Sequence, residues 1–259
     1  MSKPPTESVL RRLTSESFVA YLGQAETFES AMHPGVSSAL TGEPVADLNY
    51  LVAGRGANDS GHFGAACTAC ISRDLPFLAI IFPEAGSGVE RTAAELGLLH
   101  VVDFPFMVRE DAPIELEGND SVVVRRAVGP EGADANARVL SSAFSLPEES
   151  ARRALPATLL DAPNLDVFLA FVGNDVVGTV TVIHQGDTSG IWSMATDTTR
   201  QRSGIGRRLL STAMAETRMQ GARRFFLGAT PAGLRLYESL GFTTRVVTKV
   251  WASGETHQA

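Results

Sequence analysis

The segment from Met194 to Leu210, MATDTTRQRSGIGRRLL, decides how the second half of the chain is organised. An apolar strand pattern ends in a polar loop with two glycines, and an amphipathic helix follows. The first N–H groups of a helix have no intrahelical partner, and the aligned peptide dipoles place about half a positive charge there. The sequence therefore predicts that this junction binds an anion, with phosphate the natural candidate.

Two residue types make the junction suitable for a polyphosphate. Gly204 and Gly206 would let the main chain approach a bulky anion, because neither has a Cβ. The segment is basic within an acidic protein, since it contains Arg200, Arg202, Arg207 and Arg208. The side chains of Arg207 and Arg208 could reach a phosphate, or they could form a solvated helix face.

Two motifs in this half of the chain resemble those of one family. Residues Gln201 to Gly206, QRSGIG, match the Q/R-x-x-G-x-G/A signature of the GNAT superfamily of acetyltransferases. Residues Leu234 to Phe242, LRLYESLGF, resemble the second signature of that family. The Rossmann fingerprint G-x-G-x-x-G does not fit, because after Gly204 and Gly206 its third glycine position is Leu209. A P-loop does not fit either, because no Gly-Lys-Ser/Thr follows.

Composition narrows the class of protein. The 259 residues are 44% hydrophobic and 20% charged, which is ordinary for a globular protein with one or two cores. The net charge of -7 argues against nucleic acid bound over a wide face. Residues 1–12 lack an apolar targeting core, and the apolar run at 75–83 is too short to span a bilayer. We therefore expect a cytoplasmic protein with no membrane partner.

The two cysteines, Cys67 and Cys70, exclude a disulfide framework. Their spacing suits a redox pair or part of a zinc site, with His62 and His100 as imaginable companions. However, a redox pair normally opens a helix after a strand, whereas these cysteines lie late in an expected helix among small apolar residues. We therefore expect a packed helix face and no metal.

Apolar periodicity and turn signals predict the order of elements. One or two helices are expected over 7–32 and end at His33-Pro34-Gly35. Further helices are expected over 60–72, 89–96, 132–144, 147–155, 204–220 and 231–240. Strands are expected over 48–53, 77–82, 99–108, 122–127, 165–172, 176–184, 191–196, 224–227 and 242–251.

The acidic segment 109–120 has no strong periodicity and marks an expected domain boundary. We predict an N-terminal α/β domain over 1–110, a second domain over 121–252, and a disordered tail over 253–259. The element order of the second domain resembles a GNAT fold, an α/β fold of the α+β type. That resemblance implies a mixed, mostly antiparallel sheet with one splayed parallel pair, flanked by helices.

Part of the N-terminal domain resembles part of the second domain in sequence. Leu96-Gly97-Leu98 follows its helix as Leu240-Gly241-Phe242 follows its own, so residues 47–108 resemble half a GNAT domain. The position that matches Gly204 is Ser60, and no glycine signature accompanies it. We therefore expect this degenerate copy not to hold coenzyme A.

The resemblance implies acetyl-CoA as co-substrate and assigns a role to several residues. Tyr237 would protonate the departing sulfur, although it could instead pack beside Phe242. Thr230 stands where many relatives carry asparagine, which puts one polar contact to the cofactor in doubt. The expected cofactor-binding residues are Met194, Ala195 and Thr196, whose main chain would hold the pantetheine arm, and Gln201, Arg202, Ser203, Gly204, Ile205, Gly206 and Arg207, which would hold the pyrophosphate.

The residues on the acceptor side are less defined. A general base is not singled out among Glu148, Glu149 and Asp197, and alternation does not tell whether Trp192 or Ser193 faces the acceptor. The expected function is acetyl transfer to a primary amine of a small molecule or peptide, by direct attack in a ternary complex. Alternatives are a regulatory module that binds acyl-CoA with little turnover, a hydroxyl acceptor, or a longer acyl group. A homodimer is left open.

Overall fold

The computed structural model describes residues 4–58 and 61–254, and its contacts divide the chain into two compact units. One unit contains the residues up to Phe106 together with those from Thr244 onward, and the other runs from Met107 to Thr243. The domain bounds expected from the sequence remain a prediction. Ser60 and residues 255–259 of the expected tail lie outside the described residues.

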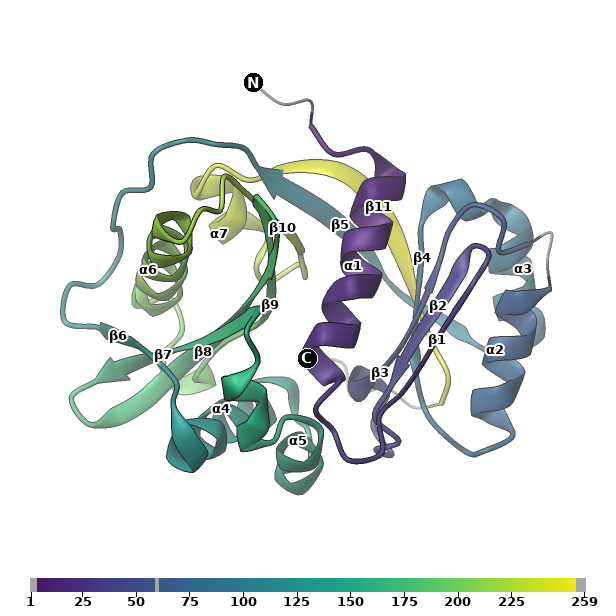
Figure 1. Cartoon of the computed structure of the whole chain (residues 1–259), viewed down its shortest axis with the longest axis horizontal. Coiled ribbons are helices and arrows are strands. Elements are labelled where there is room, and N and C mark those ends of the chain that lie inside the picture. The colour runs from purple at the N-terminus through teal and green to yellow at the C-terminus, as the bar shows by residue number, and fades with distance from the viewer. Residues whose placement is uncertain (1–3, 59–60, 255–259) are drawn as a thin grey trace. The chain divides into compact units, whose positions relative to one another are not determined.

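The first unit is a sheet with helices on both faces (Figure 1). Strands β1, β2 and β3 pair antiparallel, β3 pairs parallel with β4, and β4 pairs antiparallel with β11. Its elements are α1 (Glu7–Leu22), β1 (Glu29–His33), β2 (Val36–Leu40), β3 (Asn49–Ala53), α2 (His62–Ile71), β4 (Leu78–Ile81), α3 (Ser87–Glu95), most of β5 (Leu99–Arg109) and most of β11 (Thr243–Ala252).

Side-chain alternation along β3 explains the two faces. Tyr50 points to the α1 side, where its ring stacks on Phe18 with centroids 4.0 Å apart. Leu51 points to the other side and joins a buried core with Phe63 of α2 and Val89 of α3. Adjacent strand residues therefore serve different helices.

The helical expectation for residues 7–32 is wrong at its end. The helix stops at Leu22, and Glu29–His33 is a strand that forms a hairpin with the strand Val36–Leu40, which the sequence did not indicate. Every residue of β1 is exposed, so the strand has no apolar alternation by which it could be recognised. Gly35, with φ of 77°, makes the turn.

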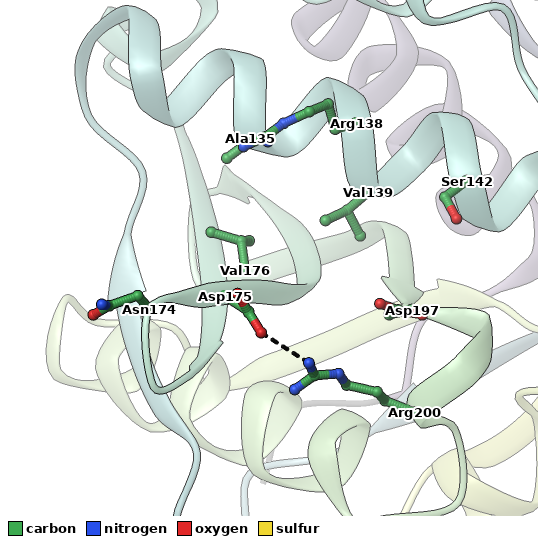
Figure 2. Close-up of a pocket in the computed structure, with 9 residues that line it drawn as sticks. All are labelled: Ala135, Arg138, Val139, Ser142, Asn174, Asp175, Val176, Asp197 and Arg200. Carbon is green, nitrogen blue, oxygen red and sulfur yellow. Dashed lines mark hydrogen bonds and ion pairs between the residues drawn. The ribbon is translucent and has the colours of Figure 1, made fainter.

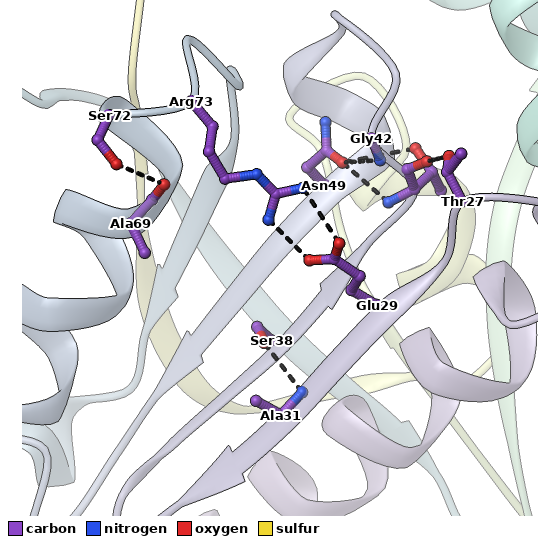
Figure 3. Close-up of polar contacts among 10 residues, drawn as sticks. Thr27, Glu29, Ala31, Ser38, Gly42, Asn49, Ala69, Ser72 and Arg73 are labelled. Carbon is purple, nitrogen blue, oxygen red and sulfur yellow. Dashed lines mark hydrogen bonds and ion pairs between the residues drawn. The ribbon is translucent and has the colours of Figure 1, made fainter.

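A buried amide holds the loops of the first unit together (Figure 3). The Asn49 side chain, which is fully buried, accepts from the backbone N–H groups of Thr41 at 2.9 Å and Gly42 at 3.2 Å. Its Nδ2 donates to the carbonyls of Glu43, Val45 and Pro76, at 2.8 to 3.0 Å. One side chain thus satisfies backbone groups of the loop at 41–45 and of Pro76.

Replacing Asn49 with alanine should therefore destabilise the first unit. The substitution leaves buried amides and carbonyls without partners, and each such group costs on the order of 1–3 kcal/mol. We expect a total loss of about 3 kcal/mol or more, measured by chemical denaturation. Asn58→Ala, a change of the same type in a loop of this unit, is the control. A loss below about 1 kcal/mol would show that water replaces the amide.

The second unit is a five-stranded sheet with helices on both faces (Figure 1). Strands β6 to β9 pair antiparallel in sequence order, and β10 pairs parallel with β9. Its elements are β6 (Val123–Arg126), α4 (Gly129–Phe144), α5 (Glu148–Ala154), β7 (Leu165–Val172), β8 (Asp175–Gln185), β9 (Thr188–Thr196), α6 (Ile205–Met219), β10 (Arg224–Gly228) and α7 (Leu234–Ser239).

Helices α4 and α6 cover opposite faces of this sheet. On one face, the buried Thr179 hydroxyl donates to Asn136 of α4 at 2.7 Å. On the other, Val180 and Phe168 pack in one core with Leu209 of α6. The expected fold class, with its mostly antiparallel sheet and one parallel pair between helices, is confirmed. Among the described residues, no helix is long and apolar enough to cross a membrane.

Candidate functional site

The parallel pair β9 and β10 opens along its length. The register joins Thr188 to Arg224 and Gly190 to Phe226, and no later residue of β9 has a partner on β10. Strand β9 nevertheless continues to Thr196 and β10 to Gly228. The pairing of β9 with β10 therefore ends at Gly190, so the splay begins several residues before Met194.

A bulge in β9 accompanies the opening. Thr179 of β8 pairs with Ala195 and Thr181 pairs with Trp192, so Val180 faces both Ser193 and Met194. Ser193 has φ of 48°, which is uncommon for a residue other than glycine. A bulge leaves an unpaired residue and bends the strand, and such features concentrate beside binding sites. Trp192 is buried against Phe226, with ring centroids 6.0 Å apart.

The N-terminus of α6 lies at the end of the same strand. Gly204 is the N-cap residue with φ of 81°, and the first intrahelical bond runs from the Arg208 N–H to the Gly204 carbonyl at 3.0 Å. The N–H groups of Ile205, Gly206 and Arg207 precede that bond and form the positive end of the helix. Gln201, Arg202 and Ser203 are exposed in the loop before it.

Gly206 brings the predicted cofactor residues together. A Cβ at this position would lie 3.2 Å from Met194 Cε, 3.4 Å from Leu236 Cδ2 and 3.5 Å from Thr196 Oγ1. Strand β9, helix α6 and helix α7 therefore meet around an atom that glycine lacks. The absence of a Cβ lets these side chains pack closely against the first turn of α6.

The arginines of the loop and helix are mostly paired with carboxylates. Arg207 Nη1 lies 2.5 Å from Glu117 Oε2, and Arg208 Nη1 lies 3.4 Å from Asp120 Oδ1. Arg202 is exposed, has φ of 61°, and has no ion-pair partner in the part of the chain that the structure describes. Arg207 and Arg208 would have to exchange a carboxylate for a phosphate in order to hold the cofactor, and that role stays a prediction.

Tyr237 lies on α7 in the core of the second unit. Its ring is 8% exposed and packs edge-on against Phe242, with centroids 6.0 Å apart. Burial raises the pKa of its hydroxyl to about 12. A Cβ on Gly233 would lie 2.6 Å from Tyr237 Cε2 and 3.1 Å from its hydroxyl oxygen, so this glycine leaves room for the ring.

Thr230 shapes the turn before α7. Its carbonyl accepts hydrogen bonds from the N–H groups of Gly233 at 3.0 Å and Leu234 at 3.1 Å. Its hydroxyl oxygen also accepts from the Gly233 N–H, at 3.3 Å. These bonds order the start of the helix that carries Tyr237. A contact from Thr230 to the cofactor remains a prediction.

Two of the three candidate bases already have polar partners. Glu148 accepts from Arg152 of the same helix, with Oε1 and Nη2 2.5 Å apart. Asp197 accepts from the Thr199 hydroxyl at 2.7 Å and the Thr199 N–H at 2.8 Å, and these bonds lower the pKa of its carboxyl. A lowered pKa makes Asp197 a weaker base. Glu149 is exposed on α5.

A cavity of about 380 Å³ adjoins the end of β9 (Figure 2). Asp175, the first residue of β8, forms an ion pair with Arg200 at 2.8 Å along the wall of the cavity. The cavity is lined by Ala135, Arg138, Val139 and Ser142 of α4, Asn174, Asp175 and Val176 of the hairpin, and Asp197 and Arg200 of the loop. Charges of both signs suit a polar ligand group rather than an apolar one.

Other titratable residues are paired or buried within the fold. His184 Nε2 lies 2.8 Å from Asp166 Oδ2, across the β7–β8 pair. Cys67 and Cys70 are free and buried on α2, and burial raises the pKa of Cys67 to about 12. The described residues contain no group of three or more His, Cys, Asp or Glu that could hold a metal.

The first unit repeats the element order but not the opening. Helix α1, the hairpin β1–β2, strand β3, helix α2 and parallel strand β4 follow the order found from α4 to β10. In the first unit, however, β3 pairs with β4 from Tyr50 to its last residue, Ala53. The pairing of β3 with β4 therefore does not open before the end of β3, and the absence of a cofactor from this copy stays a prediction. The repeat also includes a helix and hairpin that the sequence comparison of residues 47–108 left out.

Sequence reasoning missed several residues around the site. Gly233 and Leu236 belong to the site only because α7 packs against it. The sequence raised Ser193 for the direction of its side chain and not for its backbone conformation. Glu117 and Asn119 were assigned to a featureless boundary. Two signals in the sequence could have found some of these residues. One is the family motif around α7, and the other is Gly118 beside acidic residues that could pair with the arginines of α6.

Comparison with known proteins shows what this chain is similar to. Residues 163–244 match the model of an acetyltransferase (GNAT) domain. A GCN5-related N-acetyltransferase from Kribbella flavida is similar over 99% of this chain and 98% of its own, with a TM-score of 0.72 and 16% identity. A GCN5-related N-acetyltransferase from Sphaerobacter thermophilus is similar over 85% of this chain and 76% of its own, with a TM-score of 0.61 and 14% identity.

A tandem GNAT protein from the clavulanic acid biosynthesis pathway is similar over 98% of each chain, with a TM-score of 0.59 and 12% identity. A comparison with curated proteins returns no match. The structural likenesses concern the fold, whereas the family model matches the sequence of the opened strand pair and the helices beside it. Residues 163–244 are therefore similar to an acetyltransferase (GNAT) domain, and the chain has the fold of GCN5-related N-acetyltransferases.

Proposed function

We propose that this protein transfers an acetyl group from acetyl-CoA to a primary amine, by direct attack of the amine in a ternary complex. The observation that carries the proposal is the convergence at Gly206, where the freed edge of β9, the positive end of α6 and the tyrosine helix α7 meet.

Each element supports a different part of the cofactor. The free amides at Ile205 to Arg207, with Gln201 to Gly204 before them, suit the pyrophosphate. The unpaired edge of β9 at Met194, Ala195 and Thr196 can bond the amides of an extended pantetheine arm as another strand would. Acetyl-CoA would supply a thioester whose carbon accepts the amine and whose sulfur leaves as a thiolate.

Two groups of the chain would assist the transfer. Backbone N–H groups at the bulge after Ser193 can donate to the carbonyl oxygen, where negative charge develops. The Tyr237 hydroxyl keeps its proton at neutral pH, because burial raises its pKa to about 12. It therefore can donate a hydrogen bond to the sulfur. Complete transfer to a thiolate of ordinary pKa, about 8.5, would be uphill unless the same burial raises the pKa of that thiolate too.

The proposal is tested by measuring thiol release from acetyl-CoA across a panel of amines, with binding of acetyl-CoA measured in parallel by calorimetry. Release that requires an amine supports it. Tight binding with no release for any amine would instead favour a regulatory module that binds acyl-CoA. The polar contacts of Glu148 and Asp197 favour that second reading, because neither is a free base. Panels with alcohols and longer acyl-CoA donors test the remaining alternatives.

Substitutions at the candidate bases should separate structural from chemical roles. We expect Glu148→Gln and Asp197→Asn to change kcat/KM by less than about threefold, which is below about 1 kcal/mol. Glutamine keeps the helix and asparagine is as good a capping residue as aspartate. The fall of kcat/KM at low pH in the parent protein, its acidic limb, should also be present in both variants. Loss of that limb in either variant would identify the base and contradict this expectation.

A further inference from the structure

The segment from Glu110 to Ser121, here called the acidic strap, is tied to α6 and to the first residue of β10 by ion pairs. Glu110 pairs with Arg224 at 2.8 Å, and Asp111 pairs with Arg218. Glu117 and Asp120 pair with Arg207 and Arg208, as described above. The Arg109 guanidinium, nine-tenths buried, fixes the start of the strap by donating to the carbonyls of Ala112, Pro113 and Leu240.

Where the strap passes the N-terminus of α6, two glycines face each other. A Cβ on Gly118 would lie 2.6 Å from the Gly204 carbonyl oxygen and 2.7 Å from the Arg208 nitrogen. A Cβ on Gly204 would lie 3.0 Å from the Asn119 nitrogen. Both glycines have positive φ, 104° and 81°. The two backbones thus approach more closely than any other residue type permits.

Asn119 bonds the loop directly. Its Nδ2 donates to the Ser203 carbonyl at 3.2 Å, and its backbone N–H points to the Gly204 carbonyl at 3.4 Å. Its Oδ1 accepts from the Ser121 hydroxyl at 2.6 Å and the Ser121 N–H at 3.0 Å. Ser121 therefore fixes the side-chain oxygen of Asn119, and the side-chain nitrogen of Asn119 is left to bond the Ser203 carbonyl of the loop.

The direction of these bonds determines where the loop amides point. In a planar trans peptide, the C=O of one residue and the N–H of the next point in opposite directions, and the described chain has no cis peptide. Because the carbonyls of Ser203 and Gly204 point to the strap, the N–H groups of Gly204 and Ile205 point away from it. Those are the groups that a phosphate at this helix N-terminus would accept from.

We propose that Asn119, with Gly118, is a positioning residue for the phosphate-binding loop. It holds the carbonyls of Ser203 and Gly204 so that the amides of Gly204 and Ile205 are aligned before the pyrophosphate of a coenzyme A thioester arrives. Glu117 adds to this by holding Arg207, whose other nitrogen donates to Ser239 of α7 at 2.7 Å. The inference rests on the proposed function, because it names the support of the same site.

The test compares donors with and without the nucleotide. Asn119→Ala removes the side-chain bond, and Asn119→Asp keeps the size and the bonds to Ser121 but cannot donate to Ser203. We expect each to raise the Kd for coenzyme A by about five- to tenfold, as for loss of one hydrogen bond and its alignment. The kcat/KM with S-acetyl-pantetheine, which has no pyrophosphate, should stay within about twofold of the parent protein.

The matched control is Asp111→Asn, which removes an ion pair of the same strap at the far end of α6 and should leave both measurements unchanged. Thermal unfolding of every variant checks folding. An unchanged Kd for coenzyme A in Asn119→Ala would overturn the positioning role. The same conclusion would follow if the variants lost as much kcat/KM with S-acetyl-pantetheine as they lost affinity for coenzyme A. A parent protein that binds no coenzyme A would overturn the proposed function itself, which is a different outcome from binding that is indifferent to Asn119.

Discussion

A Tyr237→Phe variant is expected to lose about a hundredfold or more in kcat while it binds acetyl-CoA as the parent protein does. The substitution removes one oxygen and leaves the ring against Phe242 and Gly233. Because the hydroxyl is a proton donor to the sulfur only when negative charge develops there, its removal affects the transition state more than the bound ground state. Single-turnover rates and calorimetric Kd values measure the two effects separately.

Phe242→Leu is the control for this prediction, because it disturbs the same packing without touching the hydroxyl. A structural role for Tyr237 would make both variants lose affinity and turnover together. If the phenylalanine variant loses kcat and Kd equally, the assignment of Tyr237 as proton donor is wrong. A change in melting temperature alone would lead to the same conclusion.

The pH dependence gives a second check on Tyr237. Its folded-state pKa, about 12, lies above the ordinary value of about 10. The neutral phenol therefore favours folding fully below about pH 10, and that contribution is lost as the pH rises towards 12. In the free protein the donor should stay protonated throughout the neutral range. We expect no loss of kcat/KM from Tyr237 ionisation below about pH 10, and Tyr237→Phe should leave the acidic limb unchanged.

The second large effect is expected at Gly206. Gly206→Val places methyl groups where Met194, Leu236 and Thr196 converge, so it should raise the Kd for acetyl-CoA by about a hundredfold, or about 2.7 kcal/mol. Gly206→Ala should have a smaller effect, because the side-chain ends of Met194 and Leu236 can shift by a few tenths of an ångström. Calorimetry or equilibrium dialysis measures both.

Ala215→Val, further along α6, controls for the introduction of a β-branched side chain into this helix. It should leave the Kd unchanged. If Gly206→Val binds acetyl-CoA normally while it remains folded, the cofactor does not approach α6 at this position. The proposed pyrophosphate site would then be wrong, whatever the activity of the variant.

Features with a local cause were predictable from the sequence. The glycine loop and α6 follow from Gly204 and Gly206 beside an amphipathic pattern, and the structure places the helix at Ile205–Met219, close to the expected 204–220. The left-handed stop at Gly97 has φ of 81°, as a helix C-terminus requires. Strand β7 begins and ends at the residues that apolar alternation indicates.

Features that depend on distant partners were not predictable. Strand β1 is exposed at every residue, so only its pairing with β2 makes it a strand. The bulge at Ser193 needs β8 opposite it, and polar side chains such as Glu117 and Asn119 acquire meaning only when α6 lies beside them. Glu148 and Asp197 looked equally suited to act as a base until their contacts with Arg152 and Thr199 were known.

The segment from Met194 to Leu210 shows where the division lies. By itself, the sequence determined that a strand, a glycine loop and a helix N-terminus follow one another there, because backbone conformation and amphipathic periodicity are local properties. Only the tertiary structure decided that β9 leaves β10 after Gly190, that Gly206 meets Met194 and Leu236, and that Asn119 supports the loop. Those facts require segments far apart in the chain to pack together, and periodicity carries no record of which segments will do so.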